Sequence, residues 1–138
     1  MRSLGVIFAL LVLACNSSPT DPDGSTTVRD ATIVVPFGNS TQVNSDLRVS
    51  FAEVVEDSRC PASVVCAWAG NGGIRLDITT SRGVQSVKLN TVGGNGFPRE
   101  ASAEGYTFTL MELSPQRQTP DPIPTSQYRA TIRVMRNQ

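Results

Sequence analysis

The chain has 138 residues, and its 12 lysine and arginine residues balance its 12 aspartate and glutamate residues, so the formal net charge is zero. It contains no histidine and a single lysine, Lys88. Without a clustered positive field, the sequence offers no basis for nucleic-acid binding. The lack of histidine excludes a Ser-His-Asp triad and removes the commonest nitrogen ligand of zinc.

The first 15 residues, MRSLGVIFALLVLAC, have the organisation of a secretory signal. Arg2 supplies the positive start, and residues 4–14 form an apolar stretch that is shorter than the roughly 20 residues needed to cross a membrane. The closing letters VLAC resemble the bacterial lipobox. This resemblance implies that a signal peptide, residues 1–14, is removed and that Cys15 carries diacylglycerol and an acyl chain. No other cofactor is expected.

The residue after the lipidated cysteine bears on localisation. Lipoproteins retained at the inner membrane commonly have aspartate there, whereas this chain has Asn16. The resemblance therefore implies a membrane-anchored protein of the cell envelope, at the outer membrane facing the periplasm in a Gram-negative cell. Several acyl chains anchor a protein stably, whereas a single chain is marginal. The alternatives are an ordinary cleaved signal with a coincidental cysteine, or a signal anchor.

Residues 15–28 comprise the lipidated cysteine and a segment rich in Ser, Thr, Pro, Asp and Gly. Such a composition cannot bury enough apolar surface to offset the entropy of ordering, which predicts a flexible tether. Residues 29–138 are long enough for one domain with its own core. The sequence thus divides into a signal peptide, a tether and a single domain.

Apolar and polar residues alternate through most of this domain, which predicts β-strands. In the strand that begins at Tyr106, Met111 and Leu113 are out of phase, which predicts a bulge or a twist. The residues predicted to face inward are Ala31, Ile33, Val35, Phe37, Leu47, Val49, Phe51, Ile74, Leu76, Ile78, Val87, Leu89, Tyr106, Phe108, Leu110, Tyr128, Ala130, Ile132 and Val134.

Clusters of Gly, Asn, Ser and Pro separate these strands, and no window of 10–12 residues shows a helical stripe. The pattern predicts an all-β fold, either a single antiparallel β-sandwich of immunoglobulin-like kind or a small barrel. The glycine-rich clusters AGNGG and GGNG are expected to be hairpin turns. The proline-rich segment 115–124 is expected to be an extended loop.

Cys60 and Cys66 remain after Cys15 is assigned to the lipid, and an exported compartment is oxidising, which predicts a disulfide between them. A zinc site is the first alternative, but the chain has no histidine and the spacing fits no zinc knuckle, so no metal site is predicted. A thiol redox centre is the second alternative, although such centres usually have a Cys-x-x-Cys pair at a helix N-terminus.

Three neighbours of the cysteine pair are candidate site residues. Trp68 lies two positions after Cys66, so we expect its ring to pack near the disulfide, as large rings do in sandwich cores. We expect Asp57 and Arg59 to pair with each other or with loop backbone and so to hold the approach to Cys60. The functional alternative is a ligand-binding rim formed by Asp57, Arg59 and Trp68.

The segment DSRCPASVVCAWAG and the alternating strand after it resemble a group of uncharacterised bacterial lipoproteins that carry a DSRCP…C.WAG signature. The likeness covers most of the domain. The matching residues are Asp57, Ser58, Arg59, Cys60, Pro61, Cys66, Trp68, Ala69 and Gly70. The group has no established activity, so the resemblance implies compartment and domain identity and adds no mechanism.

No catalytic residue is predicted, because there is no Gly-x-Ser-x-Gly elbow and carboxylate pairs lie more often on surfaces than in active sites. We expect a lipid-anchored envelope protein, not an enzyme, whose β-domain has a structural role or binds an envelope protein or polymer. Outward arginines such as Arg129 and Arg133 are one indication of a binding surface. The alternatives are an exported protease-inhibitor-like domain, similar in size and class to the chagasin group but lacking its Asn-Pro-Thr-Thr-Gly motif, and a thiol redox protein using Cys60 and Cys66.

Overall fold

The computed structural model describes residues 29–94 and 96–138 of the chain. The predictions for the signal peptide, for Cys15 and for the tether fall outside the described residues. Within them the regular structure is β-strand, apart from one 3-10 helical turn at Thr125–Gln127, and they include no helix with the length and apolar character of a membrane span.

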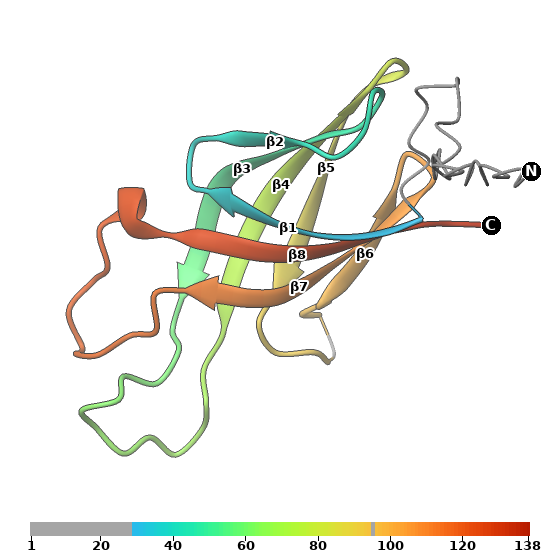
Figure 1. Cartoon of the computed structure of the whole chain (residues 1–138). Coiled ribbons are helices and arrows are strands. Elements are labelled where there is room, and N and C mark those ends of the chain that lie inside the picture. Colours follow the sequence, from blue (N-terminus) through green and yellow to red (C-terminus); the bar gives the residue numbers. More distant parts are fainter. Residues whose placement is uncertain (1–28, 95) are drawn as a thin grey trace, which may run out of the picture.

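Eight strands form two antiparallel sheets of four strands each, packed face to face (Figure 1). One sheet has the order β1-β8-β7-β6 and the other the order β2-β3-β4-β5. The expected all-β antiparallel fold with one disulfide is thereby confirmed. The strands are β1 (Asp30–Pro36), β2 (Ser40–Gln42), β3 (Arg48–Asp57), β4 (Gly72–Thr80), β5 (Gly83–Asn90), β6 (Glu100–Ala103), β7 (Tyr106–Ser114) and β8 (Arg129–Arg136).

The chain runs up and down around both sheets, because each strand is followed by its neighbour in space. The edge strands β1 and β2 belong to different sheets and lie side by side, as do β5 and β6, so the chain passes between the sheets at two seams. The last strand, β8, pairs with the first. Immunoglobulin sheets are joined by Greek-key connections instead, so the likeness to them is limited to the two-layer architecture.

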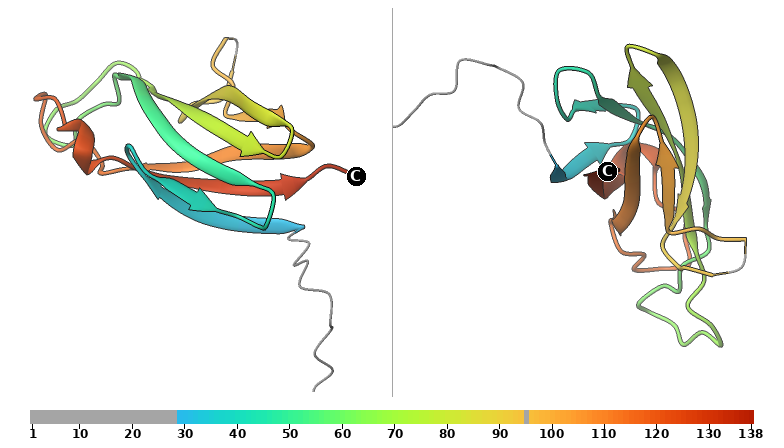
Figure 2. Two further views of the ribbon diagram at one scale, coloured as in Figure 1. Left: turned by 90° about the horizontal axis from the view of Figure 1, so that it is seen from above. Right: turned by 90° about the vertical axis from the view of Figure 1, so that its right-hand side faces the viewer.

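This up-and-down course sorts the connections to the two ends of the sandwich (Figures 1 and 2). The β1–β2, β3–β4, β5–β6 and β7–β8 connections lie at one end, which we call the loop end. The other end carries the short β2–β3, β4–β5 and β6–β7 turns. The described domain also begins there, where the Arg136 amide donates to the Arg29 carbonyl at 3.0 Å. We call it the tether end.

The core lies between the sheets, and the residues predicted to face inward form it. All of them are buried except Ala31, Ile33 and Phe37, which are half-buried in or just after the edge strand β1. Phe37 meets Phe51 edge to face, with ring centroids 5.5 Å apart. The phase of alternation alone therefore identified the inner face of every long strand.

The predicted irregularity in β7 is a β-bulge. The register with β8 shifts between Leu110 and Glu112, and this shift turns Leu113 back into the core while Met111 is 47% exposed. One extra residue in one strand of an antiparallel pair has this effect on the side chains beyond it.

Two expectations about connections were wrong. The cluster AGNGG does not form a hairpin but returns the chain from the β3–β4 connection to β4, and GGNG lies in the β5–β6 connection that crosses between the sheets. The two-residue hairpins are Ser81–Arg82, where Thr80 pairs with Gly83, and Glu104–Gly105, where Ala103 pairs with Tyr106. The short strands β2 and β6 were not predicted, because three or four residues are too few to show alternation.

We predict that Leu113→Ala lowers the free energy of unfolding by about 2–5 kcal/mol, because it leaves a cavity in the core. Met111→Ala, the matched control two residues away, should change it by about 0.5 kcal/mol or less because its side chain points outward. Urea unfolding of both variants measures the difference. Equal losses would show that the bulge does not set the phase of β7 in this way.

Candidate functional site

The β3–β4 connection is a disulfide-closed loop at the loop end. Cys60 and Cys66 are bonded, with their Cα atoms 6.0 Å apart, as the sequence predicted. Between the disulfide and the sheet, the two arms of the loop continue the hydrogen-bond ladder of β3 and β4. The Ser58 amide donates to the Asn71 carbonyl at 2.7 Å, and the Cys60 amide donates to the Ala69 carbonyl at 2.8 Å.

Gly70 lies where the returning arm passes closest to the outgoing one. Its φ is +67°, and a Cβ atom at this position would stand 1.8 Å from the Ser58 carbonyl oxygen. Any residue with a side chain would push the two arms apart and would also strain the backbone. The glycine that ends the C.WAG pattern is therefore required by the close approach of two backbones.

A buried ion pair lies at the base of the loop. Arg59 donates from Nε to Asp57 Oδ1 and from Nη2 to Asp57 Oδ2, both at 2.7 Å, and each side chain is only 8% exposed. Tyr128, directly before β8, donates its hydroxyl to Asp57 Oδ2 at 2.7 Å. The pairing of Asp57 with Arg59 is the structural role expected from the sequence, while the third partner was not foreseen.

The remaining donors of Arg59 reach across to the other sheet. Nη1 donates to the carbonyl of Leu113, and Nη2 donates to the carbonyl of Pro115 at 3.0 Å. A guanidinium group has five donors in a fixed fork, so one side chain can bind a carboxylate and two carbonyls together. Arg59 therefore joins the end of β3 to the end of β7.

These contacts determine the ionisation of Asp57 and Tyr128. Burial opposes the charge on Asp57, but the hydrogen bonds from Arg59 and Tyr128 outweigh burial and hold the pKa of Asp57 below its ordinary value. Burial and the hydrogen bond to Asp57 raise the pKa of Tyr128 to about 12. At neutral pH the site is thus an aspartate, an arginine cation and a neutral tyrosine.

Arg117, in the β7–β8 connection, holds the loop from outside the ion pair. Its Nη1 donates to the carbonyls of Asp57 and Arg59, each at 3.2 Å. The two connections also share backbone bonds, since the Ala62 amide donates to the Arg117 carbonyl and the Ser63 amide to the Gln118 carbonyl, both at 3.0 Å. These contacts could not be predicted from the sequence, because Arg117 donates to main-chain carbonyls some 60 residues away.

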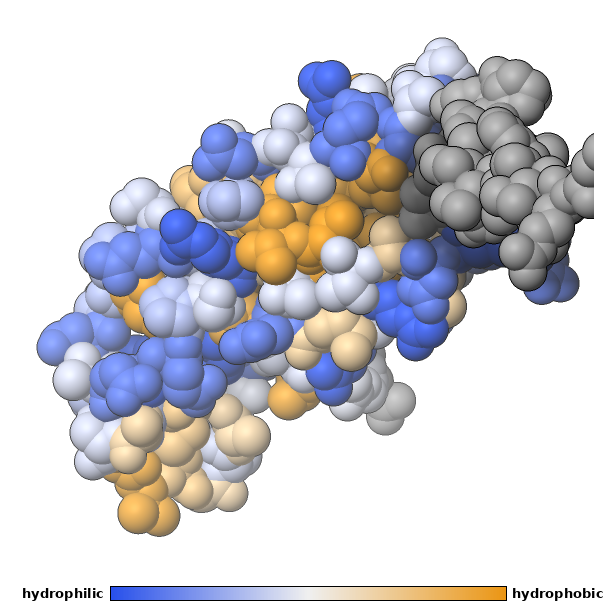
Figure 3. Space-filling view, viewed as in Figure 1, coloured by the Kyte–Doolittle hydropathy of each residue, from blue (hydrophilic) through white to orange (hydrophobic). Residues whose placement is uncertain are grey.

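The structure contradicts the expected packing of Trp68. Its side chain is 80% exposed, because the loop projects beyond both sheets and has no core to face. Val65 is fully exposed and Val64 is 42% exposed. In the space-filling view, apolar residues accordingly gather at the extremity that this loop forms (Figure 3).

The rim proposed from Asp57, Arg59 and Trp68 is therefore not one exposed surface. Asp57 and Arg59 turn into the protein and bind each other, whereas Trp68 points to solvent. Asp57 does line a small open hollow of about 270 Å³ with Tyr128 and Arg117, under the β7–β8 connection. Arg129 and Arg133 are exposed four positions apart on β8, so they share one face of that strand, outside the disulfide loop.

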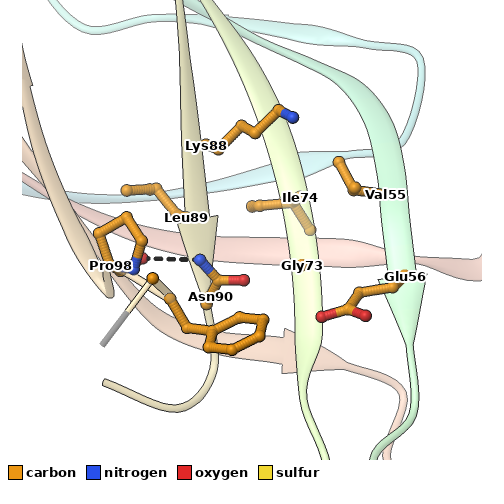
Figure 4. A pocket seen from close by; sticks show the side chains of 10 residues that line it. Val55, Glu56, Gly73, Ile74, Lys88, Leu89, Asn90 and Pro98 are labelled. Atoms are coloured by element: carbon orange, nitrogen blue, oxygen red, sulfur yellow. Dashed lines mark hydrogen bonds between the residues drawn. The ribbon is translucent and has the colours of Figure 1, made fainter. Parts of the chain in front are cut away.

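A larger open hollow of about 400 Å³ lies beside the base of the loop (Figure 4). Gly73 at its floor makes room for two neighbouring side chains, because a Cβ there would stand 3.2 Å from Asn90 Oδ1 and from Glu56 Cγ. Asn71 Nδ2 donates to a carboxylate oxygen of Glu56 and to Asn90 Oδ1, so these polar groups satisfy one another. The lining side chains are Val55, Glu56, Ile74, Lys88, Leu89, Asn90, Phe97 and Pro98.

The loop end combines an internally paired charge cluster with an exposed apolar apex. The charges of Asp57 and Arg59 are used within the protein, and no three Cys, Asp or Glu side chains of residues 29–94 and 96–138 converge as metal ligands would. The apolar apex of the loop reaches solvent, and the Phe97 ring lines the hollow at its base together with the exposed Glu56 and Lys88 side chains. Comparison of the chain with protein-family models, curated proteins and solved structures gave no match.

We predict that Arg59→Met destabilises the domain by about 3–5 kcal/mol, because it leaves Asp57 charged, buried and without its partner. The control is Arg133→Met, which breaks the exposed pair of Arg133 with Asp30 and should change stability little. Urea unfolding at neutral pH compares the two. Similar losses in both variants would mean that the buried pair does not hold the loop end together.

We predict an acid-induced loss of stability that depends on Asp57. Because the pKa of this carboxyl is lower in the folded protein than in the unfolded chain, its contribution is complete above about pH 4 and is lost as the pH falls through the lower folded value. Asp57→Asn should therefore flatten the fall in unfolding free energy between neutral pH and about pH 2. The same slope in the variant and in the wild-type protein would contradict this assignment.

Proposed function

We propose that the protein is a lipid-anchored component of the cell envelope whose β-sandwich acts by binding. The observation that carries the proposal is the separation of the two ends of the domain. The described chain begins at the tether end, and the disulfide loop projects from the opposite end. A lipid on Cys15 would thus leave the loop end directed away from the membrane.

The nature of the loop end supports binding over catalysis. The charged side chains of Asp57 and Arg59 bind each other inside the protein. The apex of the loop carries valine and tryptophan side chains, which supply no acid, base or nucleophile. Large apolar side chains held in solvent favour association instead. A second candidate function, the plugging of an exported protease's cleft, draws support from the same projecting loop.

We predict that Cys15→Ser abolishes incorporation of radiolabelled fatty acid and releases the chain into the soluble fraction, because the variant lacks the thiol that carries the lipid. Cells producing the full chain are labelled, fractionated and immunoblotted.

The matched control is the double variant Cys60→Ser and Cys66→Ser, which removes the disulfide and keeps Cys15. It should remain labelled and membrane-bound. Continued labelling of Cys15→Ser, or labelling that depends on Cys60 and Cys66, would overturn the proposed anchor.

A further inference from the structure

The apex of the disulfide loop is an apolar surface with no partner in the described chain. We call Val64, Val65 and Trp68 the tip; they are 42%, 102% and 80% exposed. The eleven residues 60–70 include no charged side chain. Burial in a partner would remove this apolar surface from water, which is favourable in proportion to the area covered.

The base of the tip is fixed by more contacts than loop closure requires. A disulfide closes the loop, and Arg59 and Arg117 bind its base. Two backbone hydrogen bonds also join its outgoing arm to the β7–β8 connection. None of these contacts buries the tip side chains. A loop ordered in advance loses less conformational entropy when it binds, so this rigidity serves recognition.

The backbone of the tip also has free hydrogen-bonding capacity. The amides of residues 65–68 donate no hydrogen bond within the described chain. Such groups are costly to place in hydrocarbon, where nothing can pair with them, whereas a protein surface can supply acceptors. The tip therefore suits a partner that combines an apolar recess with polar backbone groups.

From these observations we propose that the tip docks into an uncharged, apolar recess of a second protein of the envelope. The proposal deepens the proposed function and rests on it in one respect, the direction in which the loop faces. The tether predicted for residues 15–28 would, as a flexible 14-residue chain, span about 20 Å on average. The ten-residue strand β3 alone is about 33 Å long. Turning the tip back to the anchoring membrane would stretch the tether beyond its usual span.

A second copy of the chain fits the tip less well. Stable interfaces bury about 800 Å² on each partner, and two projecting tips facing each other cannot enclose that area. A twofold dimer whose axis passes through the tip would pair the tip with itself, and a convex surface is not complementary to a convex one. A recess that surrounds the sides of the loop meets both requirements.

The test uses the full chain in cells, with the photo-crosslinker p-benzoylphenylalanine replacing Val65. The control position is Val84, which is 67% exposed on β5 beside the tether-end hairpin. Light should link position 65, and not position 84, to one discrete protein. After identification by mass spectrometry and purification, that protein should bind the full chain, and Trp68→Ser should weaken the binding at least about tenfold. Val84→Ser should leave the affinity unchanged.

A second measurement separates lipid from protein as the occupant. Trp68 is the only tryptophan in the chain, so its fluorescence reports the tip directly. Vesicles of phosphatidylethanolamine and phosphatidylglycerol should leave its emission maximum unchanged, while the purified partner should shift it to shorter wavelength.

The proposal is overturned by the absence of an adduct, by the same adduct from both positions, by an adduct of twice the chain's mass, or by a vesicle-induced shift that Val65→Ser abolishes. An unchanged thermal unfolding midpoint confirms that Trp68→Ser still folds.

Lipid labelling of the same cells reports on Cys15 separately. An unlabelled chain whose tip still binds its partner would refute the anchor alone, and a labelled chain without the adduct would refute the docking alone.

Discussion

The buried pair of Asp57 and Arg59 is the interaction on which the loop end depends. It stands between the two sheets. Its hydrogen-bonding partners include two carbonyls at the end of β7 and the hydroxyl of Tyr128, directly before β8. A buried ion pair adds little net stability over a well-packed apolar equivalent, because both ions lose hydration. Its directional bonds do fix position, so we interpret the pair as a device that sets where the disulfide loop leaves the sandwich.

Features with a local cause could be predicted from the sequence. The inner faces of the long strands follow from alternation, and Leu113 showed the bulge by breaking that alternation. The disulfide followed from the number of available cysteines and the expected compartment. Each of these inferences needs only neighbouring residues or a count.

Features that depend on distant residues could not be predicted. Tyr128 and Asp57 are 71 positions apart, and nothing near either residue indicates that they meet. Trp68 was misplaced for a related reason, since alternation fixes which side chains share a face and does not say whether that face meets a core. Val64, Val65 and Trp68, in a loop otherwise made of small residues, were the available sign of an exposed apolar tip.

The loop end reverses the usual distribution of polarity in a sandwich. A charged pair lies inside it, and valine and tryptophan side chains lie outside it, on a loop that a disulfide and two arginines hold in place. Stability alone favours the opposite arrangement, with apolar groups buried and charges in water. The up-and-down topology adds direction, because it gathers the four connections that follow odd-numbered strands at one end and leaves the start of the domain at the other. The domain thus presents its exposed valine and tryptophan loop at the end opposite to the one where the described chain begins.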